Sequence, residues 1–272
     1  MLILGLFLSL LVGISLGLIG GGGSILTVPI LVYVLSVDAE AATAYSLFIV
    51  GVTALVGSLN YYKKGLVDLP TAVLFSLPSL ASVALVRQFV MPNIPDVVAD
   101  FGGFVLSKKL LIMGVFALLM IAASFSMIRK GKPLAAVAID DKGNAEKPPL
   151  PYFLIALEGL VVGALTGFVG AGGGFLIIPA LVVFARLDMK VAVGTSLLII
   201  GFKSLLGFIP DALSTKHVID WTMLMGITGM AVIGIFIGTS LSRYVSGDRL
   251  KPAFGYFVLV MGVYILLKET LF

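Results

Sequence analysis

The stretch Gly17-Leu-Ile-Gly-Gly-Gly-Gly-Ser24 interrupts one hydrophobic segment, and Gly167-Phe-Val-Gly-Ala-Gly-Gly-Gly174 interrupts another, 150 residues later. A helix break inside an apolar segment frees backbone N–H and C=O groups that lipid cannot satisfy. Such breaks are tolerated where they line a cavity, and matched breaks in two halves of a chain are typical of binding sites in transporters. We therefore expect both stretches to face a shared site inside a membrane protein.

The two stretches belong to a longer internal repeat. Beyond the gapless match, a shift of two residues aligns Val67-Asp68 with Ile219-Asp220, which indicates a small insertion near Pro210. The residues of the first half that recur 150 positions later are Gly13, Gly17, Gly20, Gly22, Gly23, Pro29, Leu31, Val32, Asp38, Ser46, Leu47, Gly51, Leu55 and Gly57. The chain therefore consists of two related halves.

Composition places both halves in a lipid bilayer. Hydrophobic residues make up 60% of the chain and charged residues only 12%, with a mean hydropathy of +1.17. This is too little polar surface for a soluble globule. Since roughly 20 apolar residues cross a bilayer, the pattern predicts an all-α integral membrane fold of about 8–10 membrane segments. In each half a glycine-broken element (2–19 plus 24–36; 152–169 plus 175–186) precedes three transmembrane helices (41–61, 69–90 and 105–128; 190–212, 219–241 and 250–270).

Domain limits and orientation follow from polar and basic residues. The polar stretch from Arg129 to Pro151 separates a first transmembrane repeat, 1–130, from a second, 151–272, through a linker at 131–150. If each broken element makes one net crossing, nine Lys and Arg lie inside and eight outside; if it makes two crossings or none, twelve lie inside and five outside. The positive-inside rule therefore favours two inverted repeats, with a cytoplasmic linker and both termini outside. Two short crossings and a re-entrant hairpin both satisfy this count.

The glycine breaks are the predicted substrate site. Successive glycine N–H groups can form a concave anion-binding nest, and the following short helix adds the positive end of its dipole. Tight helix packing is the alternative use of these glycines. A nucleotide-binding loop is excluded because neither stretch leads into Lys-Ser/Thr or lies in a βαβ pattern. The predicted binding residues in the breaks are Gly20, Gly21, Gly22, Gly23, Ser24, Gly170, Gly172, Gly173 and Gly174.

Two charged residues lie inside predicted membrane segments. Lys203 is near the middle of 190–212, where an ammonium costs about 2.5 kcal/mol or more, and Thr53 is its counterpart in the first half. We expect Lys203 to offset the charge of an anionic substrate; the alternative is a structural role, either reaching the interface or pairing with Glu158. Glu158 either carries a coupling proton or neutralises Lys203, and the sequence does not separate these roles.

Hydroxyl groups open the second span of each half. Ser46, Thr195 and Ser196 are predicted to donate to the substrate, although hydrogen bonds between helices are the commoner use of such residues. Four arginines at span ends are interpreted as interfacial anchors: Arg87, Arg129, Arg243 and Arg249.

Other classes of function lack the residues they need. The chain has no cysteine and one histidine, which excludes disulfides and thiolate metal sites and argues against a histidine-rich metal centre. No cofactor and no metal are expected. An embedded enzyme would require paired carboxylates or a nucleophile with its base inside the spans, so no enzymatic activity is predicted. The net charge of +4 is spread over short loops, which does not indicate nucleic-acid binding.

The motifs resemble those of the TauE/SafE family of sulfite and organosulfonate exporters over nearly the full length. The resemblance implies transport of sulfur-containing anions such as sulfite, sulfoacetate or related sulfonates across the bacterial inner membrane. It is carried by Gly17, Gly20, Gly21, Gly22, Gly23, Pro29, Asp38, Ala42, Ser46 and Leu47 in the first half, and by Gly167, Gly170, Gly172, Gly173, Gly174, Pro179, Asp188, Ala192, Val193, Gly194, Thr195, Ser196 and Leu197 in the second.

The sequence therefore predicts a secondary transporter in which two inverted halves enclose a midplane site opened alternately to each side. Its partners would be a small anion, the lipid bilayer and a coupling ion, either a proton or sodium. An anion channel and a non-transporting membrane sensor or assembly protein are the alternatives. The identity of the anion, the direction of transport and the oligomeric state stay open.

Overall fold

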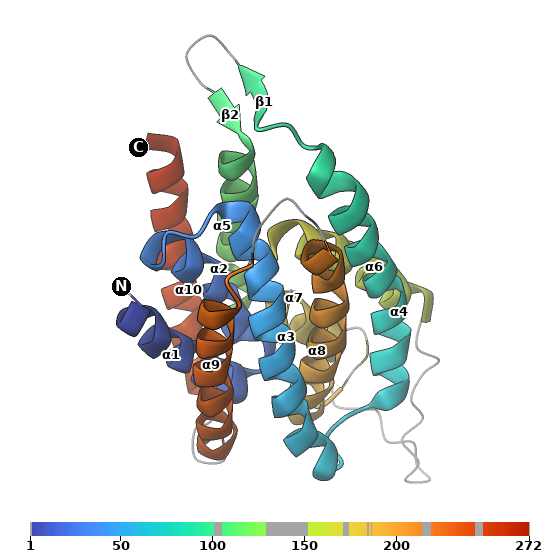
Figure 1. Ribbon diagram of the computed structural model, residues 1–272. Helices are drawn as coiled ribbons and strands as arrows, with labels where there is room; N and C mark the ends of the chain where they lie inside the picture. Colours follow the sequence, from blue (N-terminus) through green and yellow to red (C-terminus); the bar gives the residue numbers. More distant parts are fainter. Residues whose placement is uncertain are drawn as a thin grey trace, which may run out of the picture.

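Helices make up nearly all of the computed structural model shown in Figure 1, which describes residues 2–100, 105–128, 152–170, 174–183, 185, 187–213, 219–242 and 247–271. The first half comprises α1 (Leu2–Ile19), η1 (Gly21–Leu26), α2 (Thr27–Pro29), η2 (Ile30–Val34), α3 (Ala39–Lys63), α4 (Leu69–Leu85), η3 (Val86–Val90), η4 (Met91–Asn93), β1 (Val97–Asp100), β2 (Val105–Ser107) and α5 (Lys108–Ile128). The second half comprises α6 (Tyr152–Val169), α7 (Gly174–Val183), α8 (Met189–Leu213), α9 (Trp221–Leu241) and α10 (Gly247–Leu271).

The predicted all-α membrane class is confirmed. Within the described residues, five helices are long and apolar enough to cross a membrane: Ala39–Lys63, Leu69–Asn93, Lys108–Phe125, Met189–Leu213 and Trp221–Leu241. The 25-residue α10 coincides with the remaining predicted span. Both broken elements also occur where they were expected, as α1 followed by η1 to η2 and as α6 followed by α7. The predicted linker, 131–150, lies outside the described residues, and the division of the chain into 1–130 and 151–272 stays a prediction.

A small antiparallel hairpin is the one part of the described fold without a counterpart in the sequence prediction. Strands β1 and β2 pair with Val97 opposite Ser107, and an irregular register follows Val97. The hairpin extends beyond the ends of α4 and α5 (Figure 1). Only three or four residues form each strand, so no alternating pattern was long enough to be recognised.

Corresponding helices of the two halves run in opposite directions. Helix α3 runs opposite to α8, α4 opposite to α9, and α5 opposite to α10 (Figure 1). At the contact of α3 with α8, Gly51 faces Leu205 and Leu55 faces Gly201, so residue numbers rise along one helix as they fall along the other. These opposite directions are what the predicted inverted repeats require.

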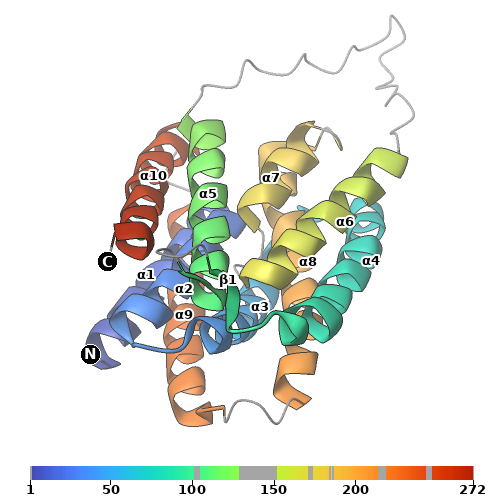
Figure 2. The same ribbon diagram turned by 90° about the horizontal axis from the view of Figure 1, so that it is seen from above.

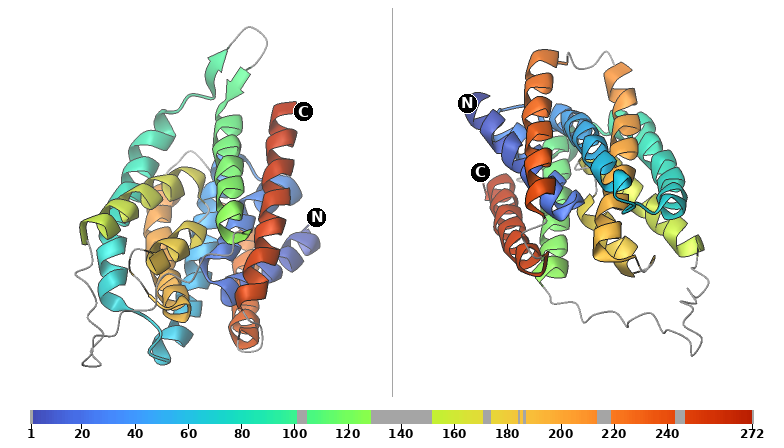
Figure 3. Two further views of the ribbon diagram at one scale, coloured as in Figure 1. Left: turned by 180° about the vertical axis from the view of Figure 1, so that it is seen from behind. Right: turned by 90° about the horizontal axis from the view of Figure 1, so that it is seen from below.

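Each half completes the packing of the other. The first helix of each half packs on a helix of the other half: α1 lies on α9, and α6 lies on α4. Helices α5 and α10 pair at one edge of the molecule (Figure 2). Helices α1 and α6 lie at a steep angle to the long helices (Figure 3). Each of these helices therefore has its closest-packed neighbour, among the described residues, in the opposite half.

Small residues allow the tilted helices to approach closely. A Cβ atom on Gly13 would collide with the carbonyl oxygen of Ala231 on α9, and a Cβ on the corresponding Gly163 would collide with that of Ser79 on α4. Helices in lipid associate through such backbone contacts because no hydrophobic force drives them together. The same close contact therefore occurs twice, between α1 and α9 and between α6 and α4.

Aspartates begin the long helices in both halves. Asp68 caps α4 by accepting from the N–H of Thr71, and Asp220 caps α9 by accepting from that of Met223. These carboxylates satisfy N–H groups that a helix start leaves free. The backbone N–H of each aspartate then bonds to a side chain of the opposite half, at the hydroxyls of Thr195 and Tyr45 respectively.

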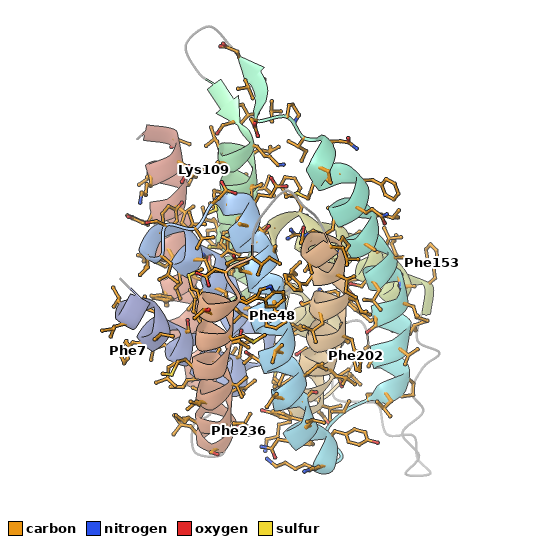
Figure 4. The ribbon with its side chains drawn as sticks, in the orientation of Figure 1. Phe7, Phe48, Lys109, Phe153, Phe202 and Phe236 are labelled. Carbon is orange, nitrogen blue, oxygen red and sulfur yellow. The ribbon has the colours of Figure 1, made fainter. Side chains whose placement is uncertain are left out.

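The outer surface of the helices is apolar. Phe7, Phe153, Phe202 and Phe236 project from the periphery of the bundle (Figure 4) and are at least half exposed within the isolated chain. Large exposed apolar side chains on every side of a helical bundle are what a lipid environment requires.

Replacing Gly13 with alanine is expected to destabilise the protein, because its Cβ would overlap the backbone of α9. Overpacking of this kind costs about 1–3 kcal/mol, which a thermal unfolding measurement in detergent detects as a lower midpoint. The matched control is Gly229→Ala on α9, where a Cβ meets nothing within 4 Å. Equal midpoints for the two variants would contradict the close packing of α1 on α9.

Candidate substrate site

The two glycine breaks meet inside the molecule. Gly20 and Gly170 have φ angles of 74° and 75°, a region that glycine adopts far more readily than residues with a Cβ. The backbone of Gly21, directly after Gly20, touches that of Gly174, four residues after Gly170, since a Cβ on either residue would collide with the Cα of the other. The two breaks therefore agree in the φ angle of their first glycine, and Gly21 and Gly174 lie against each other with no space between them.

Each break also lies against the second long helix of the opposite half. A Cβ on Gly20 would lie 3.4 Å from Ser196 Oγ, and a Cβ on Gly170 would collide with Thr43. Ser196 and its counterpart Ser46 are both fully buried. The structure thus brings the hydroxyl predicted for the second half to the glycine break of the first half.

Lys203 places a positive charge beside the second break. Its side chain is completely buried on α8, and its Nζ donates to Thr166 Oγ1 at 3.0 Å. Thr166 lies on α6, four residues before Gly170, and its own hydroxyl donates to the carbonyl of Val162. No carboxylate pairs with Lys203 among the described residues, so a neutral hydroxyl is the only polar contact that the structure gives this ammonium.

Glu158 does not neutralise Lys203 in this conformation. It is half-buried on α6, eight residues before Thr166, and forms no ion pair with the ammonium. Because eight residues span about 12 Å along a helix, the carboxylate starts well away from the hydroxyl that Lys203 contacts. The alternative of a structural Lys203–Glu158 pair therefore has no contact to support it.

Buried hydroxyls on α2, α3 and α8 have no hydrogen-bond partner among the described residues. Ser46 Oγ, Ser204 Oγ and Thr27 Oγ1 are buried and have no hydrogen-bond partner in the described part of the chain. A buried hydroxyl without a partner costs about 1–3 kcal/mol, which a ligand could recover. Thr166, Ser204 and Thr27 were not predicted; the nearness of Thr166 to Gly170 and of Ser204 to Lys203 was the available signal.

The remaining predicted residues fall into three groups. Thr195 Oγ1 accepts from the N–H of Asp68 at 2.9 Å, and Ser24 Oγ donates to the carbonyl of Gly21 at 2.7 Å, so both hydroxyls already have structural partners. Gly22 and Gly23 belong to η1, where Gly23 packs against Ser15 of α1. Gly172 and Gly173 lie outside the described residues. Substrate contact at each of these positions stays a prediction.

The interpretation of Arg87 as an interfacial anchor is wrong. Only 2% of the residue is exposed, and its Nη1 lies 3.1 Å from Asp211 Oδ2. An anchor would extend to the headgroup layer, whereas this guanidinium is enclosed between α4 and α8. Its partner belongs to the insertion near Pro210, and the repeat offers no counterpart from which the pair could have been predicted.

Replacing Thr166 with valine is expected to leave the buried ammonium of Lys203 without an acceptor and to lower the free energy of unfolding by about 1–3 kcal/mol. The matched control is Thr270→Val, because Thr270 makes the same bond to its own helix but is exposed. The Lys203→Met/Thr166→Val double variant should recover most of the loss in thermal unfolding. Additive losses in the double variant would show that the two side chains do not interact.

Comparison with known proteins agrees with this architecture. The profile of the family described as Sulfite exporter TauE/SafE matches residues 5–265. A probable membrane transporter protein of Xylella fastidiosa strain Temecula1 is 31% identical over 271 residues, covering 95% of this chain and 92% of its own. The probable membrane transporter protein YunE of Bacillus subtilis is 30% identical, covering 87% and 86%, and one of Haemophilus influenzae is 23% identical, covering 98% of both chains. No solved structure matches significantly.

These matches extend over nearly the whole chain and include all the helices that build the site. The relatives' names indicate membrane transporters rather than enzymes. With several helices long enough to span a membrane, the chain is a multi-pass bacterial membrane protein, and it belongs to the TauE/SafE sulfite exporter family.

Proposed function

We propose that the protein is a secondary exporter of small sulfur-containing anions, such as sulfite, sulfoacetate or other organosulfonates. The substrate would bind where the two glycine breaks meet, with its negative charge beside Lys203. The name of the matching family supports sulfite as one substrate of this class.

The observation that carries the proposal is the isolated charge of Lys203. A buried ammonium that contacts only a neutral hydroxyl is costly in a membrane protein. An anion bound nearby would provide the opposite charge, and the unsatisfied hydroxyls of Ser46 and Ser204 would add hydrogen bonds. The cost of keeping Lys203 charged in the empty site would then contribute to affinity for an anion over a neutral molecule.

The contact between the breaks suggests how access would alternate. Gly21 and Gly174 touch, so an anion could enter only after α1 with η1 and α6 with α7 move apart. Each of these elements packs on helices of the opposite half. A rocking motion that keeps α1 on α9 and α6 on α4, and moves these two pairs against each other, would open the breaks to one side at a time, as in inverted-repeat transporters.

Replacing Lys203 with glutamine is expected to abolish saturable efflux of sulfite or sulfoacetate from proteoliposomes and to remove the thermal stabilisation that these anions give the wild-type protein. Lys64→Gln, which removes an exposed lysine from the loop after α3, should retain both properties. Undiminished transport by Lys203→Gln would show that this ammonium is not part of the substrate site.

The same assay distinguishes the other functions. Flux that rises linearly with anion concentration would indicate a channel, because a carrier saturates when its site is occupied. Neither flux nor stabilisation with any sulfur anion would favour a sensor or assembly role.

Glu158 is the proposed coupling residue, with a proton as the coupled ion. It is half-buried on the helix that carries Thr166 and has no ion-pair partner among the described residues, so its protonation could change as that helix moves. Glu158→Gln should abolish accumulation driven by an imposed proton gradient while leaving exchange of labelled for unlabelled anion intact. Accumulation that persists, or that follows a sodium gradient instead, would exclude this role.

A further inference from the structure

We propose that a second oxyanion site lies in a cavity beside Arg87, at the end of the molecule where α3 begins and α4 and α8 end. Its ligand would be a small anion with adjacent oxygen atoms, such as a sulfonate or sulfate. The site shares no residue with the glycine breaks or Lys203. The inference goes beyond the proposed function, since it assigns anion binding to a separate cavity.

The cavity is large enough for such a ligand. Its volume is about 390 Å³, and its walls come from both halves of the chain, including Tyr45 on α3, Arg87 on η3 and Asp211 on α8. Because a water molecule occupies about 30 Å³, an oxyanion would fit together with several waters. Gln88 and Leu213 in the wall are exposed, so the cavity reaches the surface.

Arg87 supplies unused hydrogen-bond donors. Its Nη1 is paired with Asp211 Oδ2 at 3.1 Å, whereas Nε and Nη2 form no hydrogen bond within the described residues. The guanidinium has no exposed surface in this conformation, so an anion in the cavity would reach it by displacing Asp211. A guanidinium carries five N–H donors in a planar fork that matches two oxygens of an oxyanion. Burying Nε and Nη2 without acceptors costs free energy that a bound oxyanion would recover.

Tyr45 offers a further donor in the same wall. Its hydroxyl oxygen accepts from the backbone N–H of Asp220 at 2.7 Å, which fixes its position. The proton of that hydroxyl has no acceptor in the part of the chain that the structure describes, so it is free to point into the cavity. Arg87 and Tyr45 together would present donors from two different helical elements to one ligand.

Two carboxylates, Glu40 and Asp211, also line the cavity, and each forms an ion pair. Glu40 is paired with Lys108, with Nζ and Oε2 2.7 Å apart, and the carboxylate of Asp211 is paired with Arg87. An anion would therefore compete mainly with Asp211 for the guanidinium. Asp211 would act as a built-in competitor that holds Arg87 in place when the site is empty and limits the affinity for the anion.

A purely structural ion pair is the rival explanation, and it makes the opposite prediction. Removing one partner of a buried structural pair leaves an uncompensated charge and only destabilises the protein. If Arg87 is an anion site, removing Asp211 leaves a guanidinium that a bound anion can neutralise. The Asp211→Asn variant therefore distinguishes an anion site, for which the affinity for the anion should rise, from a purely structural ion pair, for which it should not.

The test is a titration of purified protein with sodium sulfate or methanesulfonate, followed by calorimetry and thermal unfolding, with sodium chloride at equal ionic strength as the control. Lys203→Met serves as the background, so that the central site does not contribute. In that background Asp211→Asn should bind sulfate about tenfold more tightly or better. Arg87→Gln/Asp211→Asn removes both charges of this ion pair together; it should fold and should not bind sulfate.

Weaker or unchanged sulfate binding in Asp211→Asn would overturn the proposal, as would sulfate binding that survives in the double variant. These outcomes do not depend on transport, because the Lys203→Met background already lacks the proposed central charge. The efflux assay with Lys203→Gln bears on the central site, whereas the sulfate titration bears on the cavity beside Arg87. Failure of one proposal is thus distinguishable from failure of the other.

Discussion

Direct contact between backbones, without intervening side chains, is the constraint on which this structure depends. Gly21 and Gly174 touch at the centre, and Gly13 and Gly163 bring the tilted helices against α9 and α4. A broken helix cannot leave its free backbone groups in lipid, so both breaks have to be enclosed by protein. The reciprocal packing of the two halves provides this enclosure, and it leaves only the outer faces of the helices for lipid.

Much of this arrangement could be predicted from the repeat and from apolar length. The ends of the six long helices lie within a few residues of the predicted spans, and the breaks occur at the predicted glycines. Local sequence signals, namely apolar runs and glycine clusters, are sufficient for that. They do not indicate which helix of one half packs on which helix of the other, because this depends on how the two halves are arranged in space.

Single residues of the candidate site could be predicted from the sequence, but the contacts between them could not. Lys203 stood out because charge is rare within spans, but its contact with Thr166 joins two helices with no shared pattern. Arg87 was misread because a span-end arginine usually faces the headgroups, and its partner, Asp211, lies in the one segment that departs from the repeat. Thr53 and Thr239 occupy the corresponding positions, so both buried cations distinguish the halves. The scaffold is nearly symmetric, whereas its internal charge is not.

The pairing of α1 with α9 has a consequence for how the chain is made. Gly13 is synthesised well before α9, the helix against which it packs. Until α9 is made, the glycine face of α1 and the break behind it lack their enclosing neighbours. The nascent first half must therefore be held by lipid, by the insertion machinery or by temporary contacts of its own, and the native core closes only when the second half has entered the membrane.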